Sequence, residues 1–145
     1  MTPLFPSETW LEIFIEKLNA NPDYKAAAKD WEGDFLFVIH PDESTKEILK
    51  EKVVWYFDLW HGECRSAMVI SPGEEVKTAY IYEGPYGNWK KLILKEIGPI
   101  KGLMQRKFKL SGNMLKVMRS TKAAQELVNS ATMVETTFID EVDEK

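Results

Sequence analysis

A run of five consecutive apolar residues, Phe35 to Ile39, constrains this chain more than any other feature of its sequence. The run is aromatic and β-branched, it follows Gly33, and Pro41 ends it, so it predicts a β-strand. No polar residue alternates with the apolar ones, which is typical of a strand that is covered on both faces. We therefore expect this segment to be the central strand of a sheet.

Three further strands are predicted after the first, and turn sequences separate them. They cover residues 53–60, 65–70 and 78–82, with His61-Gly62-Glu63 and Pro72-Gly73 at the turns. Because the connections are short, we expect these strands to pair antiparallel. A fifth strand, 106–110, alternates charged and apolar residues in the way of an edge strand.

Helical patterns stand before and after the strands. Ser7 is a candidate N-cap for a helix over 7–19, and Pro22 begins a shorter helix that extends to Lys29. After Gly84-Pro85 the apolar residues are spaced as in a helix that ends at Gly98-Pro99, and residues 114–131 form a last helical region. The expected order is αα-ββββ-α-β-αα, an α+β architecture.

Composition limits the classes of protein that this chain can belong to. Its 145 residues suit one domain, which we place at 1–134, followed by an acidic tail at 135–145 that is loosely held except where Phe138 and Ile139 dock. The net charge of −4 argues against a nucleic-acid partner. A single Cys, no apolar run of membrane-spanning length and no basic start to the chain predict a cytoplasmic protein with at most peripheral membrane contact.

No catalytic motif is evident. His40 and His61 each close a predicted strand, but the segment His61-x-Glu63-Cys64 has neither zinc-site nor metalloprotease spacing. We therefore expect no catalytic residue, no metal and no cofactor. A small enzyme using His40 and His61 is kept as a weaker alternative.

Apolar side chains are more numerous than a small core needs. Four of the six Met residues lie in the last 42 residues, and Met adapts to irregular apolar shapes, including those of ligands. This pattern allows a lipid pocket, but composition alone favours the simpler explanation that all of these residues pack against one another.

The segment from Trp89 to Val134 resembles the sterol carrier protein 2 (SCP2) domain family. In that family, a helix after the fourth strand leads through a Gly-Pro or Gly-x-x-Pro turn to a short basic strand, and a Met- and Leu-rich helix follows. The corresponding residues here are Gly98-Pro99, Gly102-Leu103-Met104, the stretch from Lys107 to Asn113, and Met114-Leu115-Lys116-Val117-Met118.

The resemblance implies a five-stranded, mainly antiparallel sheet with helices on one face, and an apolar tunnel between them that holds a fatty acyl chain, a sterol or an isoprenoid. A lipid head group would lie near Lys107, Lys109 or Arg119. The second strand contributes either Trp55, Phe57 and Leu59 or its alternate residues, since both of its faces are apolar. The other residues expected to line the tunnel are Trp89, Leu92, Ile93, Leu103, Met104, Phe108, Met114, Leu115 and Met118.

Two roles agree with this expectation. The chain is either a carrier of a small apolar lipid or an accessory module that presents an apolar substrate to a partner enzyme. The sequence leaves the choice between them open, as it does the oligomeric state.

Overall fold

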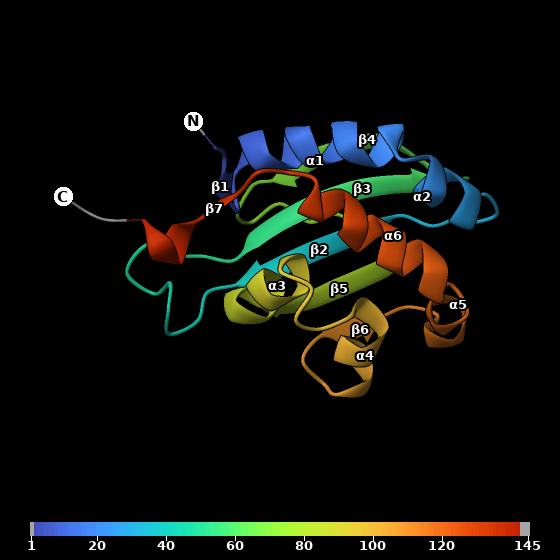
Figure 1. Cartoon of the computed structure of the whole chain (residues 1–145). Coiled ribbons are helices and arrows are strands. Elements are labelled where there is room, and N and C mark those ends of the chain that lie inside the picture. Colours follow the sequence, from blue (N-terminus) through green and yellow to red (C-terminus); the bar gives the residue numbers. More distant parts are fainter. Residues whose placement is uncertain (1, 143–145) are drawn as a thin grey trace.

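A five-stranded sheet runs through the centre of the chain in the computed structural model, which describes residues 2–142 (Figure 1). The strand order is β4-β3-β2-β5-β6, so the unbroken apolar strand is central, as predicted. The strands are β2 (Phe35–His40), β3 (Val53–Trp60), β4 (Glu63–Ile70), β5 (Tyr80–Pro85) and β6 (Lys109–Ser111).

The sheet is mixed, which corrects the expectation that consecutive strands pair antiparallel. The pairs β2–β3, β3–β4 and β5–β6 are antiparallel. After β4, however, the chain crosses over β3 and β2, so that β5 pairs with β2 and runs parallel to it. The nine residues of the connection at 71–79 can extend about 30 Å. The sideways distance from β4 to β5 is three strand spacings, or about 14 Å, so the connection is long enough to make this crossing. The carboxylate of Asp34 fixes the arrival point, since it accepts a hydrogen bond from the Ala79 N–H at 2.7 Å.

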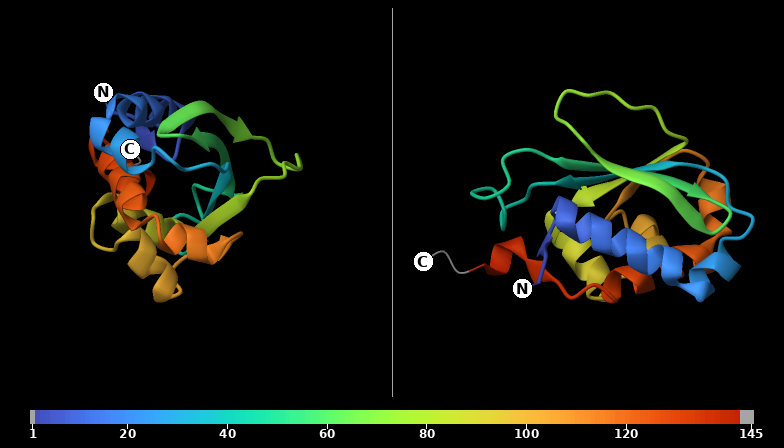
Figure 2. Two further views of the ribbon diagram at one scale, coloured as in Figure 1. Left: turned by 90° about the vertical axis from the view of Figure 1, so that its right-hand side faces the viewer. Right: turned by 90° about the horizontal axis from the view of Figure 1, so that it is seen from above.

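The two faces of the sheet are covered differently. The helices lie on one face, and the connection at 71–79 lies over the other (Figure 2). On this second face, Val76 packs against a small buried cluster of Leu36, Val38 and Ile70. Every second residue of the two central strands lies on the helical face, and this face therefore carries most of the core. These residues are Phe35, Phe37 and Ile39 of β2 and Trp55, Phe57 and Leu59 of β3.

Six α-helices form the other layer. The long helix α6 packs against each of the others. Their bounds are α1 (Glu8–Ala20), α2 (Pro22–Ala27), α3 (Tyr86–Ile93), α4 (Pro99–Met104), α5 (Met114–Met118) and α6 (Thr121–Thr132). The predicted helical region 114–131 is therefore divided into two helices, with Arg119 and Ser120 between them.

Helix α3 ends earlier than the Gly98-Pro99 signal predicts. Its last residue is Ile93, and Lys95 has a left-handed backbone with φ of 63°. The Lys95 N–H bonds to the Leu92 carbonyl, so the chain turns before Pro99 begins α4. The fifth strand also differs, because β6 covers Lys109–Ser111 instead of 106–110.

The two ends of the described chain meet. Strand β1 (Leu4–Phe5) pairs parallel with β7 (Thr137–Phe138), and a 3-10 helix, η1 (Ile139–Glu141), follows. Phe138 and Ile139 are buried, so the docking that the sequence left open does occur. The last three residues of the acidic tail, 143–145, lie outside the described residues.

The hairpin between β3 and β4 depends on close contact with α2. Gly62 has φ of 83°, and a Cβ built there would stand 2.6 Å from the carbonyl oxygen of Lys25. Gly73 has nearly the same φ, 85°, but a Cβ there would meet nothing within 4 Å.

We expect Gly73→Ala to lower the free energy of unfolding by about 1 kcal/mol, the cost of a left-handed Ala. Gly62→Ala adds a steric clash with backbone to that same cost, so its loss should reach about 3 kcal/mol. Urea unfolding of the two variants measures the difference. Equal losses would mean that the contact between the hairpin and α2 does not constrain the fold.

Candidate lipid-binding cavity

An apolar cavity of about 90 Å³ lies between the helical face of the sheet and helix α6. Its wall combines large aromatic side chains from the sheet with small side chains from α6. The lining residues are Tyr24, Trp31, Phe35, Phe37, Leu59, Tyr82, Trp89, Leu92, Pro99, Ile100, Val117, Ser120, Ala123, Ala124, Leu127 and Val128.

The small residues on α6 explain why the space exists. Ala123 and Ala124 face the aromatic rings of β2 and β5, where longer side chains would fill the gap. The sheet cannot close the gap by itself, because its rings are held against one another: the Phe35 and Tyr80 rings stack at 4.9 Å, and those of Phe37 and Phe57 lie 4.6 Å apart.

Several polar side chains in the wall form hydrogen bonds within the protein. The Tyr82 hydroxyl donates to the Pro99 carbonyl at 2.8 Å, the Trp89 Nε1–H to the Val38 carbonyl at 3.0 Å, and the Ser120 hydroxyl to the Lys116 carbonyl at 2.9 Å. Among residues 2–142, no buried side-chain nitrogen or oxygen lacks a partner. The cavity therefore presents mainly apolar surface to a ligand.

A second apolar cavity of about 40 Å³ adjoins the first along the sheet. It extends toward the N-terminal end of α1, where Phe5, Trp10 and Trp55 form its wall. Both cavities share the same five wall residues, namely Phe37, Trp89, Leu92, Leu127 and Val128. These shared side chains lie between the two spaces, which are therefore close neighbours.

The outer wall of the larger cavity is thin. Pro99 and Ile100 on α4, together with Ser120, Ala124 and Leu127, line the cavity and are also half-exposed. The cavity therefore reaches the surface where α4 meets α6.

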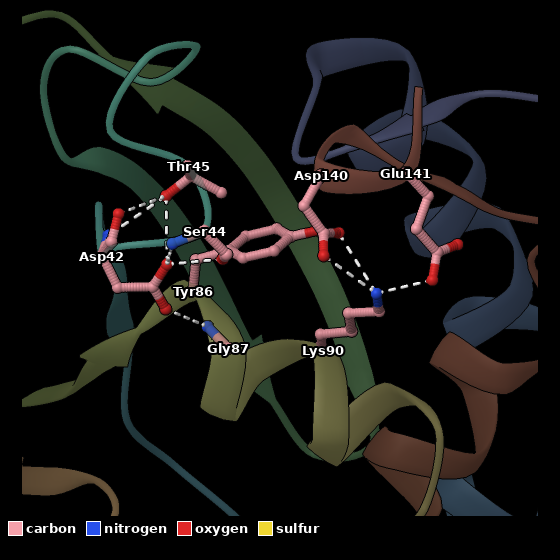
Figure 3. Close-up of polar contacts among 8 residues, drawn as sticks. All are labelled: Asp42, Ser44, Thr45, Tyr86, Gly87, Lys90, Asp140 and Glu141. Atoms are coloured by element: carbon pink, nitrogen blue, oxygen red, sulfur yellow. Dashed lines mark hydrogen bonds and ion pairs between the residues drawn. The ribbon is translucent and has the colours of Figure 1, made fainter. Parts of the chain in front are cut away.

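Helix α3 is the anchored wall of both cavities (Figure 3). At its N-terminus, the Gly87 N–H donates to the carboxylate of Asp42 at 2.6 Å. The same carboxylate accepts hydrogen bonds from the backbone and hydroxyl of Ser44 and from the hydroxyl of Thr45. Burial acts to raise the pKa of Asp42, but these hydrogen bonds outweigh it and hold the pKa below its ordinary value.

The C-terminal segment holds the same helix from the other side (Figure 3). The buried Tyr86 hydroxyl donates to the carboxylate of Asp140 at 2.7 Å, and Lys90 forms ion pairs with both Asp140 and Glu141. Burial acts to raise the pKa of Asp140, but the hydrogen bonds from Tyr86 and Lys90 lower it further than burial raises it. The position of α3 thus depends on two ionised carboxylates.

Helix α6 has fewer polar attachments to the rest of the protein. The buried side-chain amide of Asn21 donates to Ser130 at 3.0 Å and to the carboxylate of Glu126 at 3.4 Å. Lys95 donates to Asn129 at 2.6 Å. Elsewhere α6 is held by apolar contacts, many of them through alanine.

The structure brings several of the predicted lining residues together. Leu59, Trp89 and Leu92 line the larger cavity, and Trp55, Phe57 and Ile93 line the smaller one with Trp89 and Leu92. Both faces of β3 are apolar, so the sequence did not decide which one points inward. In the structure, Trp55, Phe57 and Leu59 point toward the helices. A lipid-binding role for these residues stays a prediction.

Other predicted residues are not at the cavities. Leu103 and Phe108 are buried and Met118 is half-buried, but none of the three lines either cavity. Met104, Met114 and Leu115 are exposed, by 69%, 43% and 67%. Helices α4 and α5 have only six and five residues; Met104 is the last residue of α4, and Met114 and Leu115 are the first two of α5, so all three lie at helix ends that are open to solvent.

The sequence-based prediction missed much of the helical wall. Val117, Ala123, Leu127 and Val128 line the larger cavity, but none of them is among the residues that the sequence predicts to line a tunnel. A small residue opposite aromatic side chains could have indicated a cavity, but only once the strand and the helix were known to face each other.

The two histidines do not form a common site. His40 closes β2 and its Nε2 lies 2.9 Å from Glu83, whereas His61 lies in the turn after β3 and its Nε2 is 2.6 Å from Glu32. The length of β3 separates them by about 25 Å. Burial raises the pKa of the Cys64 thiol to about 12, so this thiol is protonated at neutral pH.

Neither a metal-binding cluster nor a membrane-spanning helix occurs in the described part of the chain. Across 2–142, no group of three or more His, Cys, Asp or Glu side chains is arranged to hold a metal ion. No helix within these residues has both the length and the hydropathy needed to cross a membrane.

Comparison with known structures identifies the class of protein that has this fold. A crystal structure of sterol carrier protein 2 superposes with a TM-score of 0.77 at 29% sequence identity, covering 89% of this chain and 98% of the other. A solution structure of a Thermus thermophilus protein, described as possibly a sterol carrier protein, gives the same TM-score and identity, with 90% of each chain covered. A sec-alkylsulfatase variant shares the fold over 83% of this chain but only 16% of its own length, with a TM-score of 0.51 at 14% identity.

The family model agrees with the structural comparison. The model of the SCP-2 sterol transfer family matches residues 12–125, most of the chain, and this protein belongs to that family. Among proteins with curated functions, none matches this sequence. The resemblance seen in the sequence is therefore confirmed.

The anchoring of α3 predicts a specific loss of stability in acid. Asp140 has a lowered pKa in the folded state, so it contributes stability above the unfolded-state value near 4, and this is lost as the pH falls through the folded-state pKa. Asp140→Asn should lower the free energy of unfolding by about 1 kcal/mol at pH 7 and flatten its decline below pH ~4.

Urea unfolding between neutral and acidic pH measures both effects. Glu12→Gln is the matched control, because Glu12 is exposed on α1 and has no hydrogen-bond partner among the described residues. If Asp140→Asn declined in acid as steeply as the original protein, the clamp would not contribute to acid stability.

Proposed function

We propose that this protein binds and carries an apolar lipid, such as a fatty acyl chain, a sterol or an isoprenoid, in the space between the sheet and α6. The observation that carries the proposal is the pair of adjoining cavities, both lined almost entirely by apolar side chains. Membership of the sterol transfer family and similarity to sterol carrier structures support the same class of ligand.

The size of the cavity implies that the lipid enters by moving a wall. An engineered apolar cavity of roughly 150 Å³ holds one benzene molecule, so about 90 Å³ cannot accept a long acyl chain as it stands. Joining the two cavities would provide an elongated shape. Each methylene transferred from water contributes about 0.8 kcal/mol, which can offset the separation of packed side chains.

Helix α6 is the wall that we expect to move. The cavity side of α6 presents alanines, whereas α3 is held at its N-terminus by Asp42 and from its side by Asp140. An outward shift of α6 would separate Leu127 and Val128 from Phe37 and connect the two spaces. The lipid would enter between α4 and α6, where the wall is thin.

A second candidate function is the presentation of an apolar substrate to a partner enzyme. The occurrence of this fold as a small part of a sec-alkylsulfatase chain favours this alternative. Both functions use the same cavity, and a stable complex with an enzyme would distinguish presentation from free transport.

Filling the cavity should abolish lipid uptake. Ala123→Leu adds apolar bulk to the buried wall, and we expect palmitate binding to fall at least about tenfold, because excluding two methylenes already costs roughly 1.6 kcal/mol. Native mass spectrometry after incubation with palmitate, cholesterol or an isoprenoid alcohol measures the bound lipid.

The matched control is Gln125→Leu, which adds a similar side chain to the exposed side of the same helix and should leave uptake unchanged. Equal uptake by both variants would place the binding site elsewhere. Failure of the original protein to bind any of the three lipids would contradict the carrier proposal itself.

A further inference from the structure

The charges of this acidic protein are divided unequally along the chain. From Ile97 to Gln125 there are seven Lys and Arg residues and no Asp or Glu. The rest of the chain has the remaining 12 basic residues against all 23 acidic ones, so its formal charge is −11 while that of this segment is +7. The basic residues are Lys101, Arg106, Lys107, Lys109, Lys116, Arg119 and Lys122.

This basic segment forms one edge of the molecule. It comprises α4, β6, α5 and the first turn of α6, which lie together at the side opposite α1 (Figures 1 and 2). Helix α1 has Glu8, Glu12 and Glu16 on its exposed side. The charge distribution of the protein is therefore polarised, with a basic edge opposite an acidic edge.

Exposed apolar side chains belong to the same segment. Met104 follows the cavity residue Ile100 by one helical turn on α4, and Met114 and Leu115 begin α5, which turns Val117 into the cavity. Met104 and Leu115 are the two most exposed large apolar side chains of the described residues, at 69% and 67%. Two short helices thus present apolar side chains among lysines and arginines.

The cavity opens at this same edge. Pro99, Ile100, Ser120 and Ala124 belong to the segment, line the larger cavity and are half-exposed. Lys116 lies between the surface and the cavity, since its Nζ is 4.7 Å from the ring of the wall residue Trp31.

We propose that this edge, which we call the α4–α5 face, docks on a membrane containing anionic lipid, so that the cavity opens toward the bilayer from which the cargo comes. The basic side chains would attract anionic head groups, while Met104, Met114 and Leu115 would enter the interface between head groups and acyl chains. An acidic protein partner would satisfy the charges, but it would not need exposed methionine and leucine around the mouth of a lipid cavity. The proposal rests on the carrier function for its purpose, but its test does not depend on bound cargo.

Sedimentation with vesicles tests the electrostatic part. The unaltered protein should bind vesicles of phosphatidylcholine and phosphatidylserine, bind pure phosphatidylcholine poorly, and dissociate as salt is raised. Lys101→Glu/Arg106→Glu/Lys122→Glu should lower the partition coefficient by roughly 100-fold or more, because each basic residue near an anionic surface strengthens binding about fivefold, and each Glu adds repulsion. These three residues are exposed and make no side-chain hydrogen bond among the described residues.

The matched control is Lys50→Glu/Lys52→Glu/Lys77→Glu. It changes the net charge equally with exposed lysines outside the segment, and it should bind almost as the original protein does. Equal losses in the two triple variants would mean that net charge governs binding, which would overturn the proposal. Equal binding of the original protein to vesicles with and without phosphatidylserine would also overturn the proposal. That result does not depend on the folding of any variant.

The apolar part needs a separate comparison. Met104→Ser/Leu115→Ser should weaken binding to the anionic vesicles at least about tenfold, since each side chain loses apolar burial in the interface. Met68→Ser/Met133→Ser, with two exposed methionines outside the segment, should not. If Met104→Ser/Leu115→Ser binds normally and poly-glutamate displaces the vesicles, the face is a site for an acidic protein and the membrane proposal is wrong.

Uptake of palmitate from solution distinguishes this proposal from the carrier function. The triple charge variant should still take up palmitate dispersed without vesicles. If the protein docks on vesicles but binds no palmitate, the docking proposal stands and the carrier function is wrong. If it binds palmitate but does not dock on vesicles, the carrier function stands and the docking proposal is wrong.

Discussion

The aromatic surface on one side of β2 and β3 is the constraint on which the rest of the structure depends. Phe35, Phe37, Trp55 and Phe57 form a continuous apolar sheet face that must be removed from water, at a gain of about 1.5–3 kcal/mol for each large side chain. Helices α1, α3 and α6 supply the cover. Trp10 of α1 stacks on Trp55 at 5.7 Å, whereas the alanines of α6 leave the larger cavity uncovered between α6 and the sheet. The cavity follows from that mismatch between large and small side chains.

The two walls beside the cavity differ in how they are held. Helix α3 is fixed by charged hydrogen bonds to segments far away in the sequence, Asp42 before β3 and Asp140 near the C-terminal end. Helix α6 depends on the amide of Asn21, on Lys95 and on apolar contacts. A rigid wall facing a less restrained one suits a protein that must admit an elongated ligand, because only one element has to shift while the sheet and α3 keep the shape of the site.

The charge distribution of the protein is polarised, and its basic edge coincides with the thin wall of the larger cavity. The acidic residues of α1 lie at one edge, and the basic segment from Ile97 to Gln125 lies at the other, where the cavity wall is thinnest. Such an arrangement would orient the protein before contact, since an anionic surface attracts one edge and repels the other. Orientation and cargo access would then be achieved by the same few elements, α4, α5 and the start of α6.

The sequence alone determined the central strand, the order of the main helices and strands, and the family, because these depend on local patterns: an unbroken apolar run at Phe35–Ile39, turn residues, and the motif from Gly98 to Met118. The predicted order lacks the short elements β1, α4 and β7. Only the tertiary structure decided that β5 pairs parallel with β2, since a loop of this length allows either neighbour. It also decided which face of β3 points inward, because both faces are apolar and only the position of the helices distinguishes them. The exposure of Met104 and Leu115 was likewise undetermined, since a short helix between core and solvent carries similar residues on both sides, and composition does not record which side is covered.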